Sequence, residues 1–193
     1  MPPPVISAAF ACLLAVISAG AQQPATTTGQ FNVSGRAVSY QIRRLPLSAF
    51  PDLPPAVSSQ LAQRDCLIPQ TYEARRPENV VHASLQSSGS NDWAVLCSAG
   101  GVVSLLVFFE QAPDRPITLA SALETQRLQL RFNGELGFNW GIDPATPEQV
   151  RIAQIGLNPR PTRLDHDALA DSVIDHTTLY HYFNGAWLLL EMP

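Results

Sequence analysis

The chain has 193 residues, of which 46% are apolar and 15% are charged, and it contains 17 prolines at a net charge of −4. An average domain has about 25% charged residues and about 5% proline. This composition therefore excludes a disordered polyelectrolyte, a collagen and a long coiled coil. No cluster of basic residues is present, which argues against nucleic-acid binding, because phosphate contacts need grouped Lys and Arg.

The first 21 residues have the features of an export signal. They carry no charged side chain, and an apolar run from Val5 to Ile17 is too short to cross a hydrocarbon core of about 30 Å comfortably. The run ends in Ser18-Ala19-Gly20-Ala21, which fits the small-x-small rule for cleavage. We predict a signal peptide over 1–21 and a secreted or periplasmic mature protein. The missing basic residue near Met1 leaves an uncleaved anchor as the alternative.

Residues 22–30, QQPATTTGQ, are small, polar and aperiodic, which predicts a flexible leader. No later stretch has the composition of a linker, and no convincing long repeat is present. We therefore expect a single β-rich globular domain over residues 31–193.

The cysteines predict a covalent framework. Of the three cysteines, Cys12 lies in the export signal, so Cys66 and Cys97 remain. An even number in an oxidising compartment predicts a disulfide, and closing a loop of about 30 residues contributes about 3–4 kcal/mol of stability. Two buried free thiols are the alternative, and a catalytic cysteine or a zinc site is less well supported.

In the first half of the chain, residues 31–42 alternate around Gly35 and predict a bent strand or hairpin. Leu53, Val57 and Leu61 recur every four residues after a proline pair, which predicts a short helix that ends near Cys66. Residues 79–109 predict a three-stranded meander with Cys97 in the middle strand. The last of these strands, VVSLLVFF from Val102, is apolar on both faces and must be central in a sheet.

In the second half, alternating residues on both sides of Asn133-Gly134 predict a hairpin. Thr146-Pro147-Glu148-Gln149 is a capping box with proline at the first helical position, and Gly156 is suited to end that helix. Asn184-Gly185 predicts a closing hairpin. The expected fold is thus α+β and mainly β, built from antiparallel hairpins and a meander, with two short helices and one disulfide.

An acidic cluster precedes the closing hairpin: Asp165-His166-Asp167, then Asp171, then Asp175-His176. Carboxylates at alternating loop positions can converge on a hard cation. The segment LDHDALADSVIDHTTLYHYFNGAW resembles the FG-GAP or VCBS type of propeller hairpin, and ENVVHASLQSSGSNDWAVLCSAGGVVSLLVFF resembles the same hairpin with few acidic positions. The resemblance implies calcium binding by Asp165, Asp167 and Asp171. The alternative is that these acids cap a helical turn and solubilise a loop.

A wider resemblance covers most of the mature chain. Four segments are similar to segments of uncharacterised secreted bacterial proteins: CLIPQTY, PENVV, DWAVLCS and HYFNGAWLLL. This resemblance implies a family of unknown function and supplies no activity.

The remaining candidate residues are histidines and tryptophans. His82 lies in an alternating strand and is expected at the surface, while His176 and His181 are five residues apart and must point to opposite faces of a strand. Asp175 with His176 is the candidate acid–base pair of a hydrolase. Trp93, Trp140 and Trp187 are candidates for a carbohydrate or peptide groove, with core packing as the alternative.

No nucleophile elbow, zinc-protease motif, phosphate loop or dinucleotide fingerprint is present. We therefore expect an exported, non-enzymatic binding module whose ligand or protein partner lies outside the cytoplasm, and we expect no cofactor unless calcium binds. A small secreted hydrolase and a calcium-stabilised structural module are the alternatives.

Overall fold

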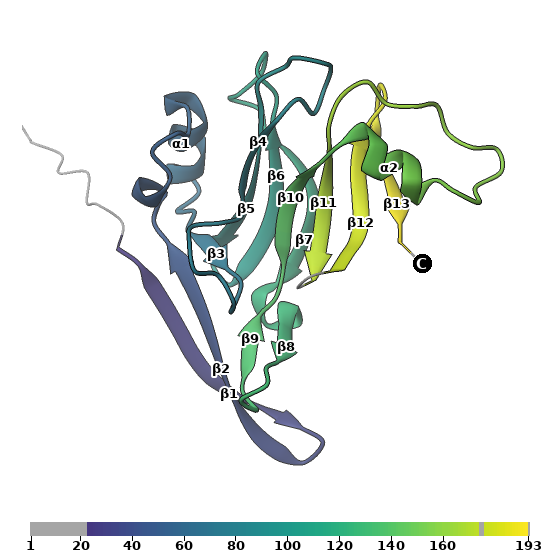
Figure 1. The fold of residues 1–193 in the computed structure, drawn as a ribbon. Helices are drawn as coiled ribbons and strands as arrows, with labels where there is room; N and C mark the ends of the chain where they lie inside the picture. Colours follow the sequence, from purple (N-terminus) through teal and green to yellow (C-terminus); the bar gives the residue numbers. More distant parts are fainter. Residues whose placement is uncertain (1–22, 174–175, 193) are drawn as a thin grey trace, which may run out of the picture.

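The computed structural model describes residues 23–173 and 176–192, and it consists of three β-sheets with one helix at each side (Figure 1). The predicted signal peptide, 1–21, lies outside the described residues. Among the described residues, no helix is long and apolar enough to cross a membrane.

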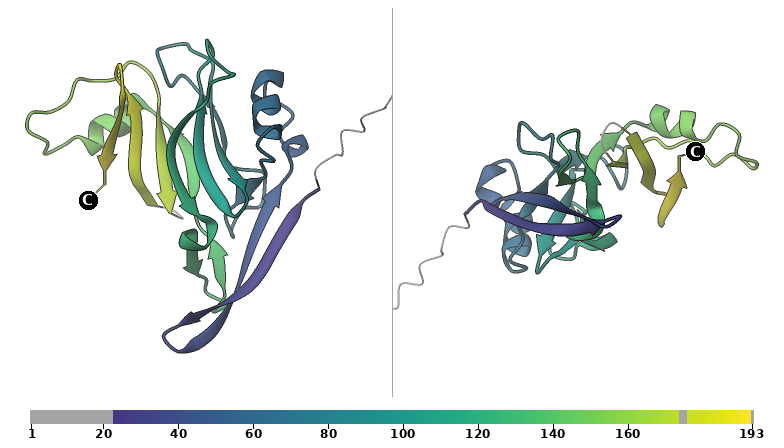
Figure 2. Two further views of the ribbon diagram at one scale, coloured as in Figure 1. Left: turned by 180° about the vertical axis from the view of Figure 1, so that it is seen from behind. Right: turned by 90° about the horizontal axis from the view of Figure 1, so that it is seen from below.

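Sheet A is a twisted platform built around one long hairpin. Its strands are β1 (Ala25–Val33), β2 (Arg36–Leu45), β3 (Ile68–Gln70), β8 (Leu128–Leu130) and β9 (Leu136–Phe138). Gly35 adopts a φ of 82° in the hairpin turn, a left-handed conformation that favours glycine. The β1–β2 hairpin extends well beyond the other two sheets (Figures 1 and 2).

Sheet B is a meander in which four antiparallel strands follow one another in chain order. The strands are β4 (Val80–Ala83), β5 (Asp92–Ala99), β6 (Val102–Phe108) and β7 (Ile117–Leu123). The apolar strand β6 lies between β5 and β7, as its sequence predicts. A short 3-10 turn, η2 (Glu124–Arg127), follows β7.

Sheet C repeats this order with β10 (Gly141–Ala145), β11 (Ala168–Val173), β12 (His176–Phe183) and β13 (Trp187–Glu191). Its first strand, β10, lies against β4, the first strand of sheet B. The largest core cluster fills the space between the sheets, and its bulkiest members are Trp140, Phe138 and Ile42.

Each of the two helices covers the outer face of one four-stranded sheet. Helix α1 (Pro55–Ala62), preceded by the 3-10 turn η1 (Leu47–Ala49), buries Val57 and Leu61 together with Leu53 against sheet B. Helix α2 (Pro147–Ala153) begins with the predicted capping box and buries Val150 against sheet C. Figure 1 shows the two helices on opposite sides of the molecule.

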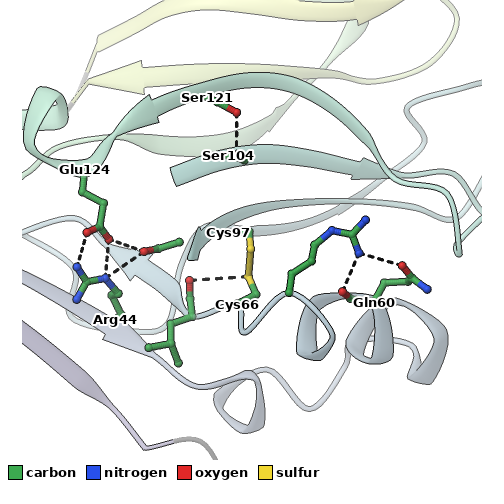
Figure 3. Close-up of a disulfide and its surroundings, with 10 residues drawn as sticks. Arg44, Gln60, Cys66, Cys97, Ser104, Ser121 and Glu124 are labelled. Carbon is green, nitrogen blue, oxygen red and sulfur yellow. Dashed lines mark hydrogen bonds and ion pairs between the residues drawn. A yellow bond between two sulfur atoms is a disulfide. The ribbon is translucent and has the colours of Figure 1, made fainter. Parts of the chain in front are cut away.

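The predicted disulfide is present and joins the end of the α1 segment to strand β5. Cys66 and Cys97 lie with their Cα atoms 5.3 Å apart (Figure 3), and both are buried. The neighbouring residues strengthen this junction, because Leu67 and Ser98 exchange two backbone hydrogen bonds of 3.0 and 2.8 Å.

A buried ion pair lies beside the disulfide and connects sheet A to sheet B (Figure 3). The Arg44 guanidinium of β2 forms a bidentate pair with the Glu124 carboxylate, and its Nε also donates to Ser98 Oγ at 3.1 Å. Its third donor reaches Thr27 Oγ1 of β1 at 2.9 Å. A buried pair is retained without a large penalty when its remaining polar atoms are hydrogen-bonded in this way.

Asn79 joins all three sheets at one buried point. Its side-chain amide donates to the Pro69 carbonyl at 2.7 Å and to the Trp140 carbonyl at 3.2 Å, while its Oδ1 accepts from the Ile142 backbone at 3.1 Å. Its own carbonyl accepts from the Leu96 backbone. Asn79 has a φ of 69°, a conformation that asparagine tolerates better than most residues.

The expected mainly β fold with two short helices, antiparallel hairpins and one disulfide is confirmed. Two details differ. Residues 25–30, expected in a flexible leader, form most of β1 and pair with β2, because their threonines suit an edge strand and backbone pairing needs no apolar pattern. In addition, β9 pairs with β2 in parallel.

Candidate functional site: an aromatic cavity beside a charged cavity

An open cavity of about 580 Å³ lies between the segment that precedes α1 and the outer face of sheet B. The buried Leu53 anchors this segment under α1, so residues 49–52 stand over the sheet near one end of β4 and β5. The cavity has aromatic and proline walls and one carboxylate. Its main lining residues are Phe50, Asp52, Pro77, Val80, His82 and Trp93.

A stacked pair of rings forms the floor of this aromatic cavity. His82 of β4 and Trp93 of β5 are directly opposed in the strand register, and their ring centroids are 4.6 Å apart with 15° between the planes. On its other side Trp93 opposes the buried Phe108 of β6. The three rings thus form a row across three strands, and the row is fixed by backbone pairing rather than by a loop.

A second cavity, of about 720 Å³, begins on the other side of Pro77, which lines both. This charged cavity lies between the loop 71–78 and the strands β10 and β11. Three carboxylates, two guanidiniums and two hydroxyl groups line it: Glu73, Glu78, Asp143, Arg75, Arg76, Thr71 and Ser172.

Both ends of the loop at the charged cavity are held by hydrogen bonds. Gln70 Oε1 accepts from the Glu78 backbone at 3.0 Å, and Gln70 Nε2 donates to the Glu78 carbonyl at 3.1 Å. The Glu78 carboxylate accepts from the Thr71 backbone at 2.6 Å. These hydrogen bonds hold the two ends of the loop together, and Pro77 of this loop lines both cavities.

The three aspartates predicted to share a calcium ion are not brought together. Asp165 is exposed and pairs with His166, whereas Asp167 Oδ2 accepts from the Ser84 backbone at 3.1 Å. Asp171 is 1% exposed and lies 3.4 Å from His181 Nε2. Because β11 begins at Ala168, the side chains before and within it point to separate partners, and no group of three potential metal ligands occurs among the described residues.

The histidines near this cluster have structural contacts. In His166, Nδ1 pairs with Asp165 at 2.7 Å and Nε2 pairs with the Phe183 carbonyl at 2.9 Å, so both ring nitrogens are occupied. The Asp165 pKa is lowered from its ordinary value, mainly by the hydrogen bond from His166. Of the candidate hydrolase pair, His176 is exposed at the start of β12, and Asp175 lies outside the described residues.

The three tryptophans have different surroundings. Trp140 is fully buried in the core, and the Arg127 guanidinium lies 3.9 Å from its ring centroid. Trp187 is partly buried and stacks on Phe109 at 6.0 Å. Only Trp93, of the three, lines either of these cavities.

Several lining residues have no individual signal in the sequence. Phe50, Asp52 and Pro77 come from two separate loops, and only the fold places them near Trp93. The adjacent Arg75 and Arg76 can be recognised in the sequence as charged loop residues. The sequence does not indicate that they line the same cavity as Asp143. No family model, no curated protein and no solved structure matches this chain.

Proposed function

We propose that this protein is an exported, disulfide-stabilised binding module, and that its ligand places a flat, weakly polar ring in the aromatic cavity. The observation that carries the proposal is the His82–Trp93 stack, which lines a cavity of about 580 Å³. Ligand pockets typically combine apolar and aromatic walls with a few polar groups that orient the ligand. Here Asp52 and His82 supply those groups.

Export is supported by the sequence of residues 1–21 and by the covalent link between Cys66 and Cys97. Disulfides persist outside the reducing cytosol. In this protein the bond fastens the end of the α1 segment to the same sheet that carries Trp93, so an oxidising compartment helps to hold the two walls of the aromatic cavity together.

Binding is favoured over acid–base catalysis by His166 and His181, the two histidines that contact an aspartate side chain in the described structure. His166 uses both ring nitrogens in structural contacts, and the Asp171–His181 pair is buried. A general base must reach the proton that it abstracts in a plausible substrate pose, and neither histidine lines the aromatic or the charged cavity.

The experiment is a binding screen of neutral oligosaccharides and of random peptides, read by tryptophan fluorescence and confirmed by calorimetry. We expect the change in fluorescence on binding to disappear in Trp93→Phe, and the affinity to fall at least tenfold in Trp93→Ala. His82→Ala, an exposed substitution, is expected to weaken binding without unfolding the protein.

Phe132→Ala is the matched control, because this ring is fully exposed at the tip of the β8–β9 hairpin, outside the aromatic cavity. It is expected to bind like the parent. Binding that is unchanged in both Trp93→Ala and His82→Ala would show that the ligand site lies elsewhere.

A further inference from the structure

The charged cavity is lined by exposed ionic side chains of both signs. Arg75, Arg76, Glu73 and Asp143 are all exposed, and none of them forms a side-chain hydrogen bond or ion pair within the described part of the chain. Glu78 also lines the cavity, but one oxygen of its carboxylate already accepts from the Thr71 backbone. The cavity therefore presents two cations and two anions without side-chain partners, beside a third carboxylate that is held by the loop.

The balance of these groups limits the chemistry of the ligand. A purely anionic ligand would meet Glu73 and Asp143, and a purely cationic one would meet the two arginines, so each would be opposed by like charges. A neutral sugar chain would leave all four ionic groups without ionic partners. Charges of both signs close together are a property of peptides, through their side chains and their termini.

The position of Pro77 links this chemistry to the aromatic cavity. Because Pro77 lines both cavities, the two cavities adjoin at this residue, and an extended peptide advances about 3.3 Å per residue. The walls formed by Phe50, Pro77 and Trp93 suit an aromatic or proline side chain, as in other aromatic-lined peptide grooves.

We propose that the two cavities form one peptide-binding groove. An aromatic or proline side chain of the peptide lies against His82 and Trp93. A neighbouring carboxylate pairs with Arg75 or Arg76, whose planar guanidiniums suit bidentate contacts, and a cationic group faces Asp143 and Glu73. This inference rests on the proposed function, because it assigns a ligand class to the aromatic cavity and adds the charged cavity as a second subsite.

The test begins with selection of a displayed library of random 12-residue peptides on the whole mature protein. We expect enrichment of sequences in which an aromatic residue or proline lies within three residues of an acidic and a basic residue. One enriched peptide is then synthesised in three forms: unchanged, with its charged residues replaced by glutamine, and with its aromatic residue or proline replaced by alanine.

The decisive variant is Arg75→Gln with Arg76→Gln. It should lower the affinity for the unchanged peptide at least tenfold and leave the affinity for the glutamine form almost unchanged. The matched control is Arg36→Gln with Arg115→Gln, which removes the same charge from two exposed arginines outside both cavities. The control should bind the unchanged peptide like the parent at physiological ionic strength.

The outcomes separate this inference from the function on which it rests. If Trp93→Ala abolishes peptide binding but the Arg75/Arg76 variant does not change it, the second subsite is wrong and the aromatic site stands. If the control variant weakens binding as much as the decisive one, the effect is long-range charge and the subsite is also wrong. If no peptide is enriched while a neutral oligosaccharide binds in a Trp93-dependent way, the peptide class is overturned and the binding module stands.

Discussion

Sheets B and C are both four-stranded meanders. Asp92 is the first residue of the second strand of sheet B, and Asp167 immediately precedes the second strand of sheet C. In sheet B, the buried Asp92 of β5 accepts four hydrogen bonds, from the Leu85, Gln86 and Glu110 backbones and from Ser90 Oγ, at 2.5–2.9 Å. In sheet C, Asp167 accepts one from the Ser84 backbone. Asp92 therefore holds together segments that flank three strands of sheet B. Asp167 makes a single side-chain link from sheet C to sheet B.

The difference extends to the buried polar atoms. Four buried side-chain atoms in the described residues lack a hydrogen-bond partner, and all four belong to sheet C or to segments that flank it: Trp140 Nε1, Gln154 Nε2, Asp171 Oδ1 and Trp187 Nε1. An unsatisfied buried polar group costs about 1–3 kcal/mol. We therefore expect sheet C to be less stable than sheet B, which carries the disulfide and the cavity aromatics.

Replacement of the aspartate in sheet B should have the largest effect. Asp92→Ala leaves three backbone N–H groups without their acceptor, whereas Ser90 Oγ can still donate to the Ser87 carbonyl. We expect a loss of about 4 kcal/mol in the free energy of unfolding. Urea denaturation of the parent and the variant measures this. Asp92→Asn, which keeps an acceptor oxygen, should lose less than Asp92→Ala. A loss below about 1 kcal/mol in Asp92→Ala would remove the contrast between the sheets.

Removal of the disulfide should be the next largest change. The bond closes a sequence separation of 31 residues, and the double variant Cys66→Ser/Cys97→Ser should lose about 3–4 kcal/mol by the chain-entropy estimate. Under reducing conditions the parent should lose a similar amount, whereas the variant should not respond to reductant. Non-reducing mass spectrometry of the mature protein checks the bond itself, and two alkylated cysteines in an unreduced sample would contradict it.

The elements that could be predicted from the sequence are those with a local pattern. Leu53, Val57 and Leu61 share one face at helical spacing, and the apolar run of β6 requires a central position; both are confirmed. Residues 25–30 of β1 were not predicted as a strand, because their polar threonines show no alternation and only the pairing with β2 reveals them. Prediction from local pattern therefore works better for elements with buried side chains than for polar edge strands.

The candidate site shows the same limit. Trp93 could be singled out from its residue type. Its partner His82 lies on the neighbouring strand, but Phe50, Asp52 and Pro77 come from loops that only the fold brings to it. Asp165, Asp167 and Asp171 are not brought together for a related reason. Their spacing in the sequence is right for a loop, but Ala168 already starts β11, so Asp171 lies within a strand and faces His181.

In sheet C, the corresponding aspartate should matter less than in sheet B. Asp167→Ala removes one acceptor from the Ser84 backbone, while the hydrogen bond from the Asp167 backbone to the Ser84 carbonyl, at 2.8 Å, is kept. We expect a loss of about 1 kcal/mol, measured by the same urea titration. A loss as large as that of Asp92→Ala would mean that the link between the two sheets, rather than the interior of sheet B, dominates stability.

The smallest effect should come from the Asp165–His166 pair just before β11, in which the aspartate is exposed. The hydrogen bond from His166 lowers the Asp165 pKa in the folded protein. Its contribution is therefore complete above the ordinary carboxyl pKa of about 3.9 and is lost as the pH falls through the lower folded value. In a melting-temperature series from about pH 5 to pH 2, Asp165→Asn should flatten the acid-induced decline slightly.

Solvent limits the size of this effect, because the Asp165 side chain is 83% exposed and its charge is screened. The difference between the parent and Asp165→Asn should therefore shrink further at high salt. Asp114→Asn provides the control, since this exposed aspartate has no side-chain hydrogen bond in the described structure. If the decline of melting temperature at low pH becomes equally shallow in the control, the effect comes from net charge. If it becomes shallower only in Asp165→Asn, one acid-sensitive contact of sheet C lies in the segment just before β11.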